Sequence, residues 1–278
     1  MRGKTIVITG ATSGIGEVTA IRLAEQGARI VFTARDDERA KTTMAKLQKA
    51  NGASEHVVHL ADLSLLAEQK RVAGEIAAEP QIDVLIDNAG AMFNTRSETA
   101  DGLEKTFALN HMAYFTLTKL LLDKIKATPG ARIVVVASNA HRGAQLAFDD
   151  LQSKRGYGGF KVYSKSKLCN ILFTRALARR LAGTGVTANS LHPGFVATRF
   201  GDQSGGVMQR LVAIAKPVGA ISPEEGAKTI IYLASSPDVA MVSGEYFYEC
   251  KTTAPTKEAQ NDADAERLWR VSAEIAGL

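Results

Sequence analysis

The strongest constraint on the fold of this 278-residue chain is an alternation that runs through most of its length. Short segments rich in β-branched residues are each followed by a longer segment whose apolar residues have helical spacing. Strands that are almost entirely apolar must be covered on both faces, as in a parallel sheet between two layers of helices. The sequence therefore predicts an α/β protein with a doubly wound parallel sheet. Its expected strands are 5–8, 29–33, 56–60, 84–86, 132–137, 186–191 and 244–248.

The composition is that of an ordinary globular protein. Hydrophobic residues make up 45% of the chain and charged residues 23%. No repeat, low-complexity segment or linker rich in Pro, Gly or Ser divides it, so we expect a single domain over residues 1–278. The two cysteines, Cys169 and Cys250, are too few for a disulfide scaffold or a structural zinc site. Metal-ligand spacing is absent as well, and the sequence predicts no metal.

Charge and hydropathy argue against nucleic-acid binding and against a membrane span. The chain has 34 Lys and Arg against 29 Asp and Glu, a net charge of +5, but no run of five cationic residues. No apolar stretch approaches the roughly 18 residues of a spanning helix, and the start of the chain lacks the pattern of a signal peptide. We expect a soluble, cytoplasmic protein that binds a small molecule, with homo-oligomerisation left open.

A glycine-rich turn follows the first expected strand and precedes a helix over about 17–26. Glycines at this place let the backbone approach a pyrophosphate, whose charge is stabilised by the helix N-terminus. A tight turn with a structural role alone is the alternative. The candidate cofactor contacts in the turn are Gly10, Thr12, Ser13, Gly14, Ile15 and Gly16.

The end of the second expected strand carries the residues that select the cofactor. An arginine here accommodates the 2′-phosphate of NADP, whereas an acidic side chain binds the ribose 2′-hydroxyl of NAD. Arg35 therefore indicates NADP, and the adjacent Asp36 keeps NAD as the less favoured alternative.

Tyr163 and Lys167 lie on an expected helix that runs to about residue 181. Residues four apart share one face of a helix, so both side chains can reach the same point, whereas Lys165 should face elsewhere. A nearby ammonium group favours phenolate and lowers the pKa of a tyrosine. The pair is thus a candidate for proton transfer near neutral pH.

The chain resembles the short-chain dehydrogenase/reductase family from end to end. Its residues 9–16 match the family's cofactor turn, and residues 87–90 match its N-N-A-G motif with Asp87 in place of the first Asn. A finer likeness is to the retinol dehydrogenase-like branch. The stretches that carry it are 109–111, 163–170, 182–187, 191–194 and 267–272. Many members of that branch have an N-terminal membrane anchor, which we do not find here.

The resemblance implies a Rossmann-type fold and a catalytic tetrad of Ser138, Tyr163, Lys167 and Asn110. Tyr163 would exchange a proton with the substrate oxygen and Ser138 would bind that oxygen. Lys167 would lower the pKa of Tyr163 and hold the nicotinamide ribose, and Asn110 would hold a water of a proton relay. In the family's register Arg35 occupies the slot that selects NADP. Further implied cofactor contacts are Asp62, Leu63, Asn88, Ala89, Gly90, Tyr163, Lys167, Pro193, Gly194, Val196 and Thr198. For Asp62, the alternative is an acid at a helix N-terminus, ahead of Ser64.

Two long segments without a clear strand or helix, 138–162 and 199–221, follow expected strands at the carboxyl edge of the sheet. Long loops at this edge are usually functional, and we expect active-site walls in the first and a substrate lid in the second. The alternative for the second is an apolar stripe that packs on the core. His111, His141 and His192 have no acidic partner in motif spacing and are interpreted as structural or loop-facing, and Cys169 as a small packed side chain.

These observations predict an NADP-dependent oxidoreductase for the carbonyl or alcohol group of an apolar substrate, such as an aldehyde, a ketone or a retinoid-like compound. The alternative is a non-catalytic NADP-binding sensor on the same fold, because a fold does not fix a function. Sensors tend to lose the catalytic side chains, whereas Ser138, Tyr163, Lys167 and Asn110 are all present here. A nucleic-acid-binding protein is the weakest alternative, since it rests on the net charge alone.

Overall fold

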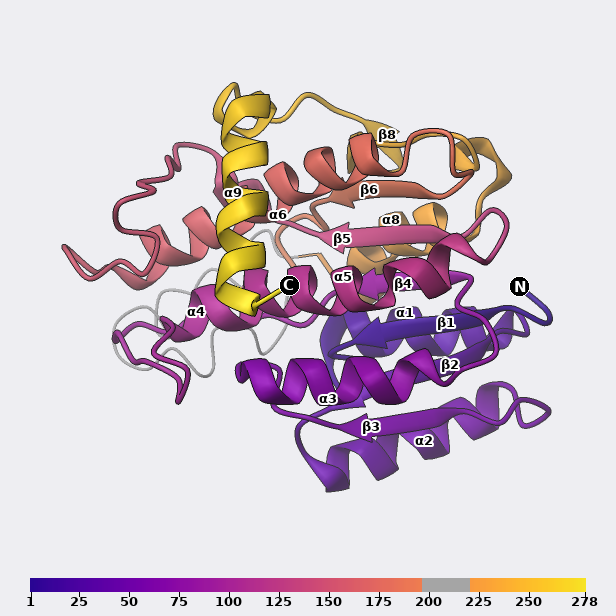
Figure 1. The fold of residues 1–278 in the computed structure, drawn as a ribbon. Coiled ribbons are helices and arrows are strands. Elements are labelled where there is room, and N and C mark those ends of the chain that lie inside the picture. Colours follow the sequence, from indigo (N-terminus) through magenta and orange to yellow (C-terminus); the bar gives the residue numbers. More distant parts are fainter. Residues whose placement is uncertain (197–220) are drawn as a thin grey trace.

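The computed structural model describes residues 1–196 and 221–278. Its centre is an eight-stranded sheet in the order β3-β2-β1-β4-β5-β6-β7-β8 (Figure 1). The strands pair in parallel as far as β7, and β8 pairs antiparallel with β7. This order confirms the predicted doubly wound α/β fold. The strands are β1 Thr5–Thr9, β2 Arg29–Ala34, β3 Val57–Leu60, β4 Val84–Asp87, β5 Arg132–Val136, β6 Thr187–Leu191, β7 Tyr246–Tyr248 and β8 Lys251–Thr252.

Helices cover both faces of the sheet, as Figure 1 shows. Helices α1, α2 and α8 pack together on one face, and α3, α5, α6 and α9 lie on the other. The α-helices are α1 Gly14–Glu25, α2 Asp37–Ala50, α3 Leu66–Ala77, α4 Lys105–Phe107, α5 Ala113–Lys126, α6 Gly159–Arg180, α8 Pro223–Ser235 and α9 Asp262–Ala276. Shorter helical turns are η1 Ala108–Met112, η2 Asn139–His141, η5 Pro237–Val239 and η6 Glu258–Gln260.

Two hydrophobic cores result, one on each face of the sheet. Successive side chains of a strand point to opposite faces, so neighbouring residues enter different cores. Ile6 and Ile8 of β1 belong to the core under α1, α2 and α8. Val7 between them belongs to the core under α3, α5, α6 and α9. Because both faces are buried, the strands contain few polar residues, which explains the nearly continuous apolar runs in the sequence.

The structure corrects the predicted elements in several places: α1 begins at Gly14 rather than at about 17, and β7 begins at Tyr246 rather than at 244. The helix with Tyr163 begins at Gly159, one turn earlier than the sequence suggested. A Cβ on Gly159 would lie 2.7 Å from the Phe93 carbonyl oxygen, so this glycine serves close packing inside a helix rather than a loop. The sequence reading also missed β8, because its two exposed residues carry no apolar pattern.

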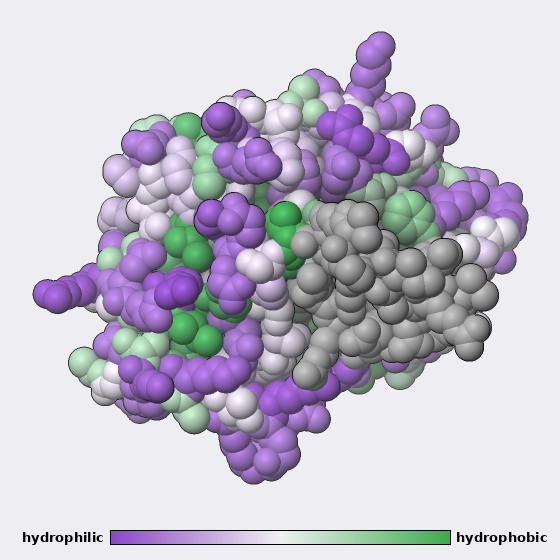
Figure 2. All heavy atoms as spheres, turned by 180° about the vertical axis from the view of Figure 1, so that it is seen from behind, coloured by the Kyte–Doolittle hydropathy of each residue, from purple (hydrophilic) through white to green (hydrophobic). Residues whose placement is uncertain are grey.

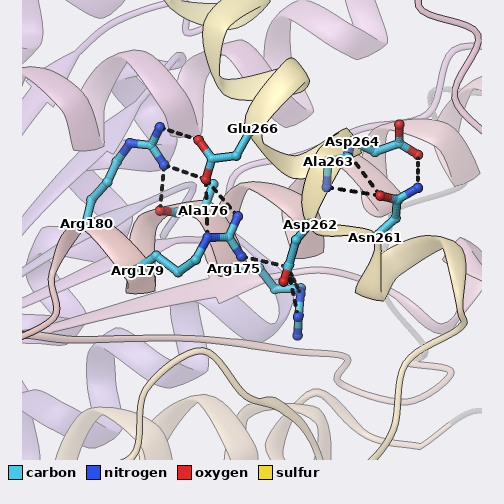
Figure 3. A network of polar contacts seen from close by, with 9 residues as sticks. All are labelled: Arg175, Ala176, Arg179, Arg180, Asn261, Asp262, Ala263, Asp264 and Glu266. Atoms are coloured by element: carbon cyan, nitrogen blue, oxygen red, sulfur yellow. Dashed lines mark hydrogen bonds and ion pairs between the residues drawn. The ribbon is translucent and has the colours of Figure 1, made fainter.

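Helix α9 is fixed across α6 by a network of charged side chains (Figure 3). Asp262 accepts from Arg175 and Arg179, and Glu266 accepts from Arg179 and Arg180. The Arg180 guanidinium also lies 4.1 Å from the centre of the Trp269 ring. Because α6 carries Tyr163 and Lys167, this network helps to fix the helix on which the candidate catalytic pair stands.

The face seen in Figure 2 is mostly hydrophilic, and the hydrophobic residues drawn in colour form small groups on it. None of the helices within the described ranges is long and apolar enough to cross a bilayer. The lid expected over 199–221, apart from Ile221, lies outside the described residues, and so does Thr198.

Candidate active site

A pocket of about 1380 Å³ opens at the carboxyl ends of the parallel strands. Ligands of doubly wound sheets bind at this edge, and the volume suits a dinucleotide with a small substrate. The pocket brings together most of the residues singled out in the sequence. These are Gly10, Thr12, Ser13, Gly14, Ile15, Gly16, Arg35, Asp62, Leu63, Asn88, Ala89, Gly90, Ser138, Tyr163, Lys167, Pro193, Gly194 and Val196. Asn110 does not line it.

The glycine-rich turn packs closely against neighbouring backbone because its glycines have no side chains. Gly10 has φ +69°, and a Cβ there would lie 2.8 Å from Ala89 Cα. A Cβ on Gly16 would lie 2.3 Å from the Gly10 carbonyl oxygen. No side chain caps α1 at Ser13, so the first backbone N–H groups of this helix remain available to a phosphate. These features fit the pyrophosphate of a dinucleotide cofactor.

Thr9 and Asn88 tie this turn to the end of β4. The backbone N–H groups of Asn88 and Ala89 both donate to Thr9 Oγ1, at 2.9 and 3.0 Å. Asn88 Nδ2 donates to the carbonyl oxygens of Thr9 and Gly10, at 2.8 and 3.1 Å. The side chain of Asn88 therefore holds the turn in shape, in addition to lining the pocket. The sequence analysis did not foresee this role of Thr9.

At the adenosine end of the pocket, Asp36 caps α2. Its carboxylate accepts from the backbone N–H of Arg39 at 2.8 Å. The side chains of Arg35 and Arg39 line the pocket on either side, and neither has an ion-pair partner among the described residues. Arg39 was missed in the sequence, because its proximity to Arg35 depends on the turn between β2 and α2.

Asp62 lines the same end of the pocket and turns the chain toward α3. One of its carboxylate oxygens accepts from the backbone N–H of Ser64 at 3.0 Å and from its hydroxyl at 2.8 Å. These bonds are those of the acid ahead of a helix, the alternative weighed for this residue. The second carboxylate oxygen and the place in the pocket leave an adenine contact available as well.

Ser138 and Tyr163 meet at the opposite end of the pocket. Ser138 follows β5 and caps η2, where its Oγ accepts from the Ala140 N–H at 3.1 Å. Burial raises the pKa of Tyr163 to about 12, and a side-chain hydrogen bond with Ser138 partly offsets this rise. The two hydroxyls are therefore neighbours, as a shared substrate oxygen requires.

Lys167 lies beneath this pair and is almost fully buried. Its Nζ donates to the Val136 carbonyl oxygen at 2.9 Å and lies 5.8 Å from the centre of the Tyr163 ring. Burial lowers the pKa of Lys167 to about 7. The expected lowering of the Tyr163 pKa by a lysine cation is thus wrong for this structure, because burial disfavours the charge of both groups. Lys165 does not line the pocket, in agreement with its expected orientation.

Asn110 lies in the π-helical turn η1 between α4 and α5. Its Nδ2 donates to the Ala91 carbonyl oxygen and to Ser166 Oγ, at 2.9 and 3.0 Å, and its Oδ1 accepts from the Ala91 N–H at 2.9 Å. A Cβ on Gly90 would lie 3.2 Å from Asn110 Oδ1 and 3.6 Å from Lys167 Nζ, so both groups border Gly90. The structure therefore gives Asn110 a positioning role beside Lys167.

The comparison with known families agrees with this geometry. A family model described as short chain dehydrogenase matches residues 4–205. The chain belongs to the short-chain dehydrogenase family. Retinol dehydrogenase 14 of Homo sapiens is 40% identical over 100% of this chain and 88% of its own length. Retinol dehydrogenase 12 of Homo sapiens is also 40% identical, over 99% of this chain and 87% of its own length. These matches confirm the resemblance to the retinol dehydrogenase-like branch.

Solved structures of the same fold cover most of this short-chain dehydrogenase. An uncharacterized protein from Mycobacterium paratuberculosis gives a TM-score of 0.81 at 30% identity, over 99% of this chain and 94% of that one. The NADP active-site complex of RhlG from Pseudomonas aeruginosa gives a TM-score of 0.70 at 28% identity, over 89% and 94%. The first of these supports the Rossmann-type fold across nearly the whole length.

Asp87 marks a departure of this short-chain dehydrogenase from the family motif. The side chain is fully buried at the end of β4, where Thr118 Oγ1 donates to its Oδ2 at 2.8 Å. Its Oδ1 has no partner among the described residues. Burial raises the pKa of Asp87 to about 8, so the carboxyl is largely protonated at neutral pH. In this neutral form, the Asp87 side chain resembles the asparagine of the family motif in charge as well as in shape.

The three histidines singled out in the sequence, His111, His141 and His192, differ in their surroundings. His111 is fully buried and its Nε2 pairs with Ser272 Oγ at 2.8 Å, consistent with a structural role. His141 is also buried, and its Nδ1 lies 2.8 Å from the Ser138 carbonyl oxygen. His192, in contrast, lines the pocket. The sequence did not predict this place in the pocket, because the position of His192 beside Tyr246 and Tyr248 depends on contacts between distant parts of the chain.

The wall of the pocket beyond Tyr163 is rich in apolar and aromatic side chains that sequence reading did not single out. They are Met92, Phe93, Leu109, Phe160, Phe195 and Tyr248. Phe160 and Phe195 are more than half exposed, as expected for apolar walls of an open pocket. Within the described ranges, no cluster of His, Cys, Asp or Glu could hold a metal ion.

Proposed function

We propose that this chain is an NADP-dependent oxidoreductase that transfers a hydride between the nicotinamide and the carbonyl or alcohol group of an apolar substrate. The observation that carries the proposal is the meeting of the Ser138 and Tyr163 hydroxyls at the pocket, with Lys167 beneath them. The bound cofactor would supply the hydride. The residues of the chain orient the reactants and handle the proton.

Each candidate catalytic side chain has a distinct task in this proposal. The high pKa of Tyr163, which burial raises to about 12, keeps its hydroxyl protonated and ready to donate to a carbonyl oxygen. The Ser138 hydroxyl donates to the same oxygen and stabilises the negative charge that develops there. Lys167 Nζ holds the nicotinamide ribose hydroxyls. Asn110 positions the loop after β4 and keeps Gly90 close to Lys167.

The preference for NADP rests on the adenosine end of the pocket. Arg35 and Arg39 offer two guanidinium groups to a 2′-phosphate, which suits bidentate recognition. The Asp36 carboxylate, the group that would favour NAD, already accepts from the Arg39 N–H. The related Pseudomonas aeruginosa structure contains NADP, in agreement with this choice.

The substrate class follows from the wall of the pocket. Its phenylalanines and methionine favour an apolar body, and the retinol dehydrogenases at 40% identity are named for an apolar alcohol. A non-catalytic NADP-binding sensor is the other candidate. The intact set of Ser138, Tyr163, Lys167 and Asn110 favours the enzyme, because a sensor does not need these groups in contact.

Activity assays with a panel of substrates test the proposal. Aldehydes and ketones are assayed with NADPH and NADH, and alcohols with the oxidised forms of both cofactors. We expect consumption of NADPH with apolar aldehydes, and a kcat/KM for NADPH at least about tenfold above that for NADH. Tight NADPH binding without turnover of any member would favour the sensor. A preference for NADH would contradict the assignment of Arg35 and Arg39.

A further inference from the structure

The histidine that lines the substrate end of the pocket is fixed by contacts with two tyrosines. The His192 ring stacks on Tyr248 with centroids 4.1 Å apart and a 10° interplanar angle. It also stacks on Tyr246, at 5.4 Å and 23°. The side chain is only 7% exposed. A ring held in this way has little freedom to turn, so the protonation of each nitrogen decides what His192 can bind.

The neighbouring hydrogen bonds determine that protonation. His141 Nδ1 lies 2.8 Å from the Ser138 carbonyl oxygen, which can only accept, so this nitrogen carries a proton. His141 Nε2 in turn accepts from the Thr256 N–H at 3.3 Å. Tyr246 Oη lies 2.8 Å from His192 Nδ1 and 3.5 Å from His141 Nδ1. Since His141 Nδ1 is a donor, the Tyr246 hydroxyl gives its own proton to His192 Nδ1.

A neutral His192 with an accepting Nδ1 must carry its proton on Nε2. The hydrogen bonds of the described residues include none to His192 Nε2, and His192 lines the pocket. Burial, together with the nearby charges of His141 and Arg142, lowers the pKa of His192 to about 4. The ring therefore stays neutral at physiological pH and offers one N–H donor to a ligand.

Arg142 supplies a charge at the same end. It lines the pocket and its charge acts on His192, as the lowered pKa of that histidine shows. Its Nε donates to Asn139 Oδ1 at 2.7 Å, and it has no carboxylate partner among the described residues. The acidic side chains of the described lining, Asp36 and Asp62, are at the adenosine end. Among the described lining residues, the substrate end thus offers donors and no carboxylate acceptor.

We infer that His192 Nε2 and the Arg142 guanidinium form a binding subsite for a carboxylate at the far end of the substrate. The inference rests on the proposed function and narrows its substrate class to aldehydes or ketones with an apolar body and an anionic terminus. Arg142 follows Ser138 by four residues across η2, about 8 Å at the rise of a 3₁₀-helix. A body of one aromatic ring fits such a separation, and Phe93 and Phe160 belong to the apolar lining of the same pocket.

Two aldehydes that differ only at the far end test the inference: 4-formylbenzoate and its methyl ester, each with NADPH. We expect the acid to have a kcat/KM at least about tenfold above that of the ester, equivalent to about 1.4 kcal/mol. Arg142→Gln should reduce the ratio to about one, and Arg142→Lys should restore part of it through its charge. His192→Phe, which keeps a flat ring beside the two tyrosines, should raise KM for the acid.

Arg270→Gln is the matched control, because Arg270 is an exposed arginine of α9 that does not line the pocket. It should leave the ratio at the parent value. Equal kcat/KM for the two aldehydes in the parent, or a ratio that Arg142→Gln does not change, would overturn the subsite while the proposed oxidoreductase stands.

If neither aldehyde is reduced, the proposed function fails for this class and a binding measurement decides on the subsite. Calorimetric titration with terephthalate, which carries a carboxylate at each end of the same ring, then compares the parent with Arg142→Gln. Binding at least tenfold weaker in the variant supports the subsite. Equal binding, or no binding to the parent, overturns it.

Discussion

The Asp36 carboxylate accepts a hydrogen bond from the backbone N–H of Arg39 at 2.8 Å. This contact links two residues that line the same end of the pocket and that the proposed NADP preference sets against each other. A carboxylate engaged at a helix N-terminus is stabilised in place, and the Arg39 side chain is directed from the same turn. The alternative for NAD that Asp36 suggests in the sequence is therefore weakened by local structure.

Replacing Arg35 by Ala and Ala34 by Asp should move the cofactor preference from NADP toward NAD. The double change removes a partner of the 2′-phosphate and supplies an acceptor for the 2′-hydroxyl. We expect the ratio of kcat/KM for NADPH over NADH to fall at least about tenfold, or 1.4 kcal/mol. Asp36→Ser is the control, since serine also caps helices, and it should leave the ratio unchanged. If Asp36→Ser changes this ratio more than the double variant does, Asp36 and not Arg35 is the residue that selects the cofactor.

The pH dependence of the two reaction directions should differ. Because burial raises the pKa of Tyr163 to about 12, the phenol stays protonated and carbonyl reduction keeps its proton donor up to about pH 9. Alcohol oxidation needs the phenolate, so its kcat/KM should still rise with pH above pH 9. Profiles of kcat/KM in both directions measure this. A plateau of oxidation from about pH 7.5 would show that Lys167 lowers the Tyr163 pKa after all.

Asp87→Asn should stabilise the protein at pH 8 and have little effect at pH 4. Burial raises the pKa of Asp87 from 3.8 to about 8, so between these values the folded state holds a proton that the unfolded state has released. Stability therefore falls as the pH rises through this window, and asparagine removes the effect. We expect a gain of at least about 1.4 kcal/mol at pH 8, the equivalent of one pKa unit.

Urea unfolding of the parent and of Asp87→Asn at both pH values is the measurement. Thr118→Val, which removes the donor to Asp87 Oδ2, is the companion variant and should destabilise the protein at pH 8. A pH-independent difference between the parent and Asp87→Asn would mean that Asp87 is ionised in the folded protein.

Glu266→Gln should lower the stability at neutral pH and cease to do so in acid. Hydrogen bonds from Arg180 hold the pKa of Glu266 at about 2, below its usual 4.5. The contribution of the Glu266 carboxylate to the free energy of unfolding is complete above pH 4.5 and is lost as the pH falls through about 2. Since the side chain is partly exposed, solvent screening limits the loss to about 1 kcal/mol. Thermal unfolding of both proteins between pH 7 and pH 2 should show the curves converge, and parallel curves would contradict this.

Much of the fold could be predicted because its signals are local. The buried strands and the turn from Thr9 to Gly16 have patterns that short stretches of sequence carry. The first turn of α6 could not be predicted from the sequence. The close contact that requires a glycine at position 159 is with Phe93, more than sixty residues away. The same holds for β8, which has no apolar pattern of its own.

In the candidate site, too, local spacing predicts some contacts, whereas others depend on the fold. Tyr163 and Lys167 share one helix, so their spacing alone brought them together. His192 and Tyr246 are 54 residues apart and meet only through the pairing of β6 with β7. The pKa of Tyr163 also escaped sequence reasoning, because spacing shows that a lysine is near but not that both groups are desolvated.

The most direct test of the account is Tyr163→Phe, which removes one hydroxyl and leaves the ring in place. Calorimetric titration should show NADPH bound to the variant as tightly as to the parent, because the cofactor contacts of the glycine turn and of Arg35 are intact. Turnover of an apolar aldehyde should fall below about a hundredth of the parent rate, the least that a general acid contributes. Turnover above that level, with NADPH binding retained, would contradict the role of Tyr163 as the proton donor.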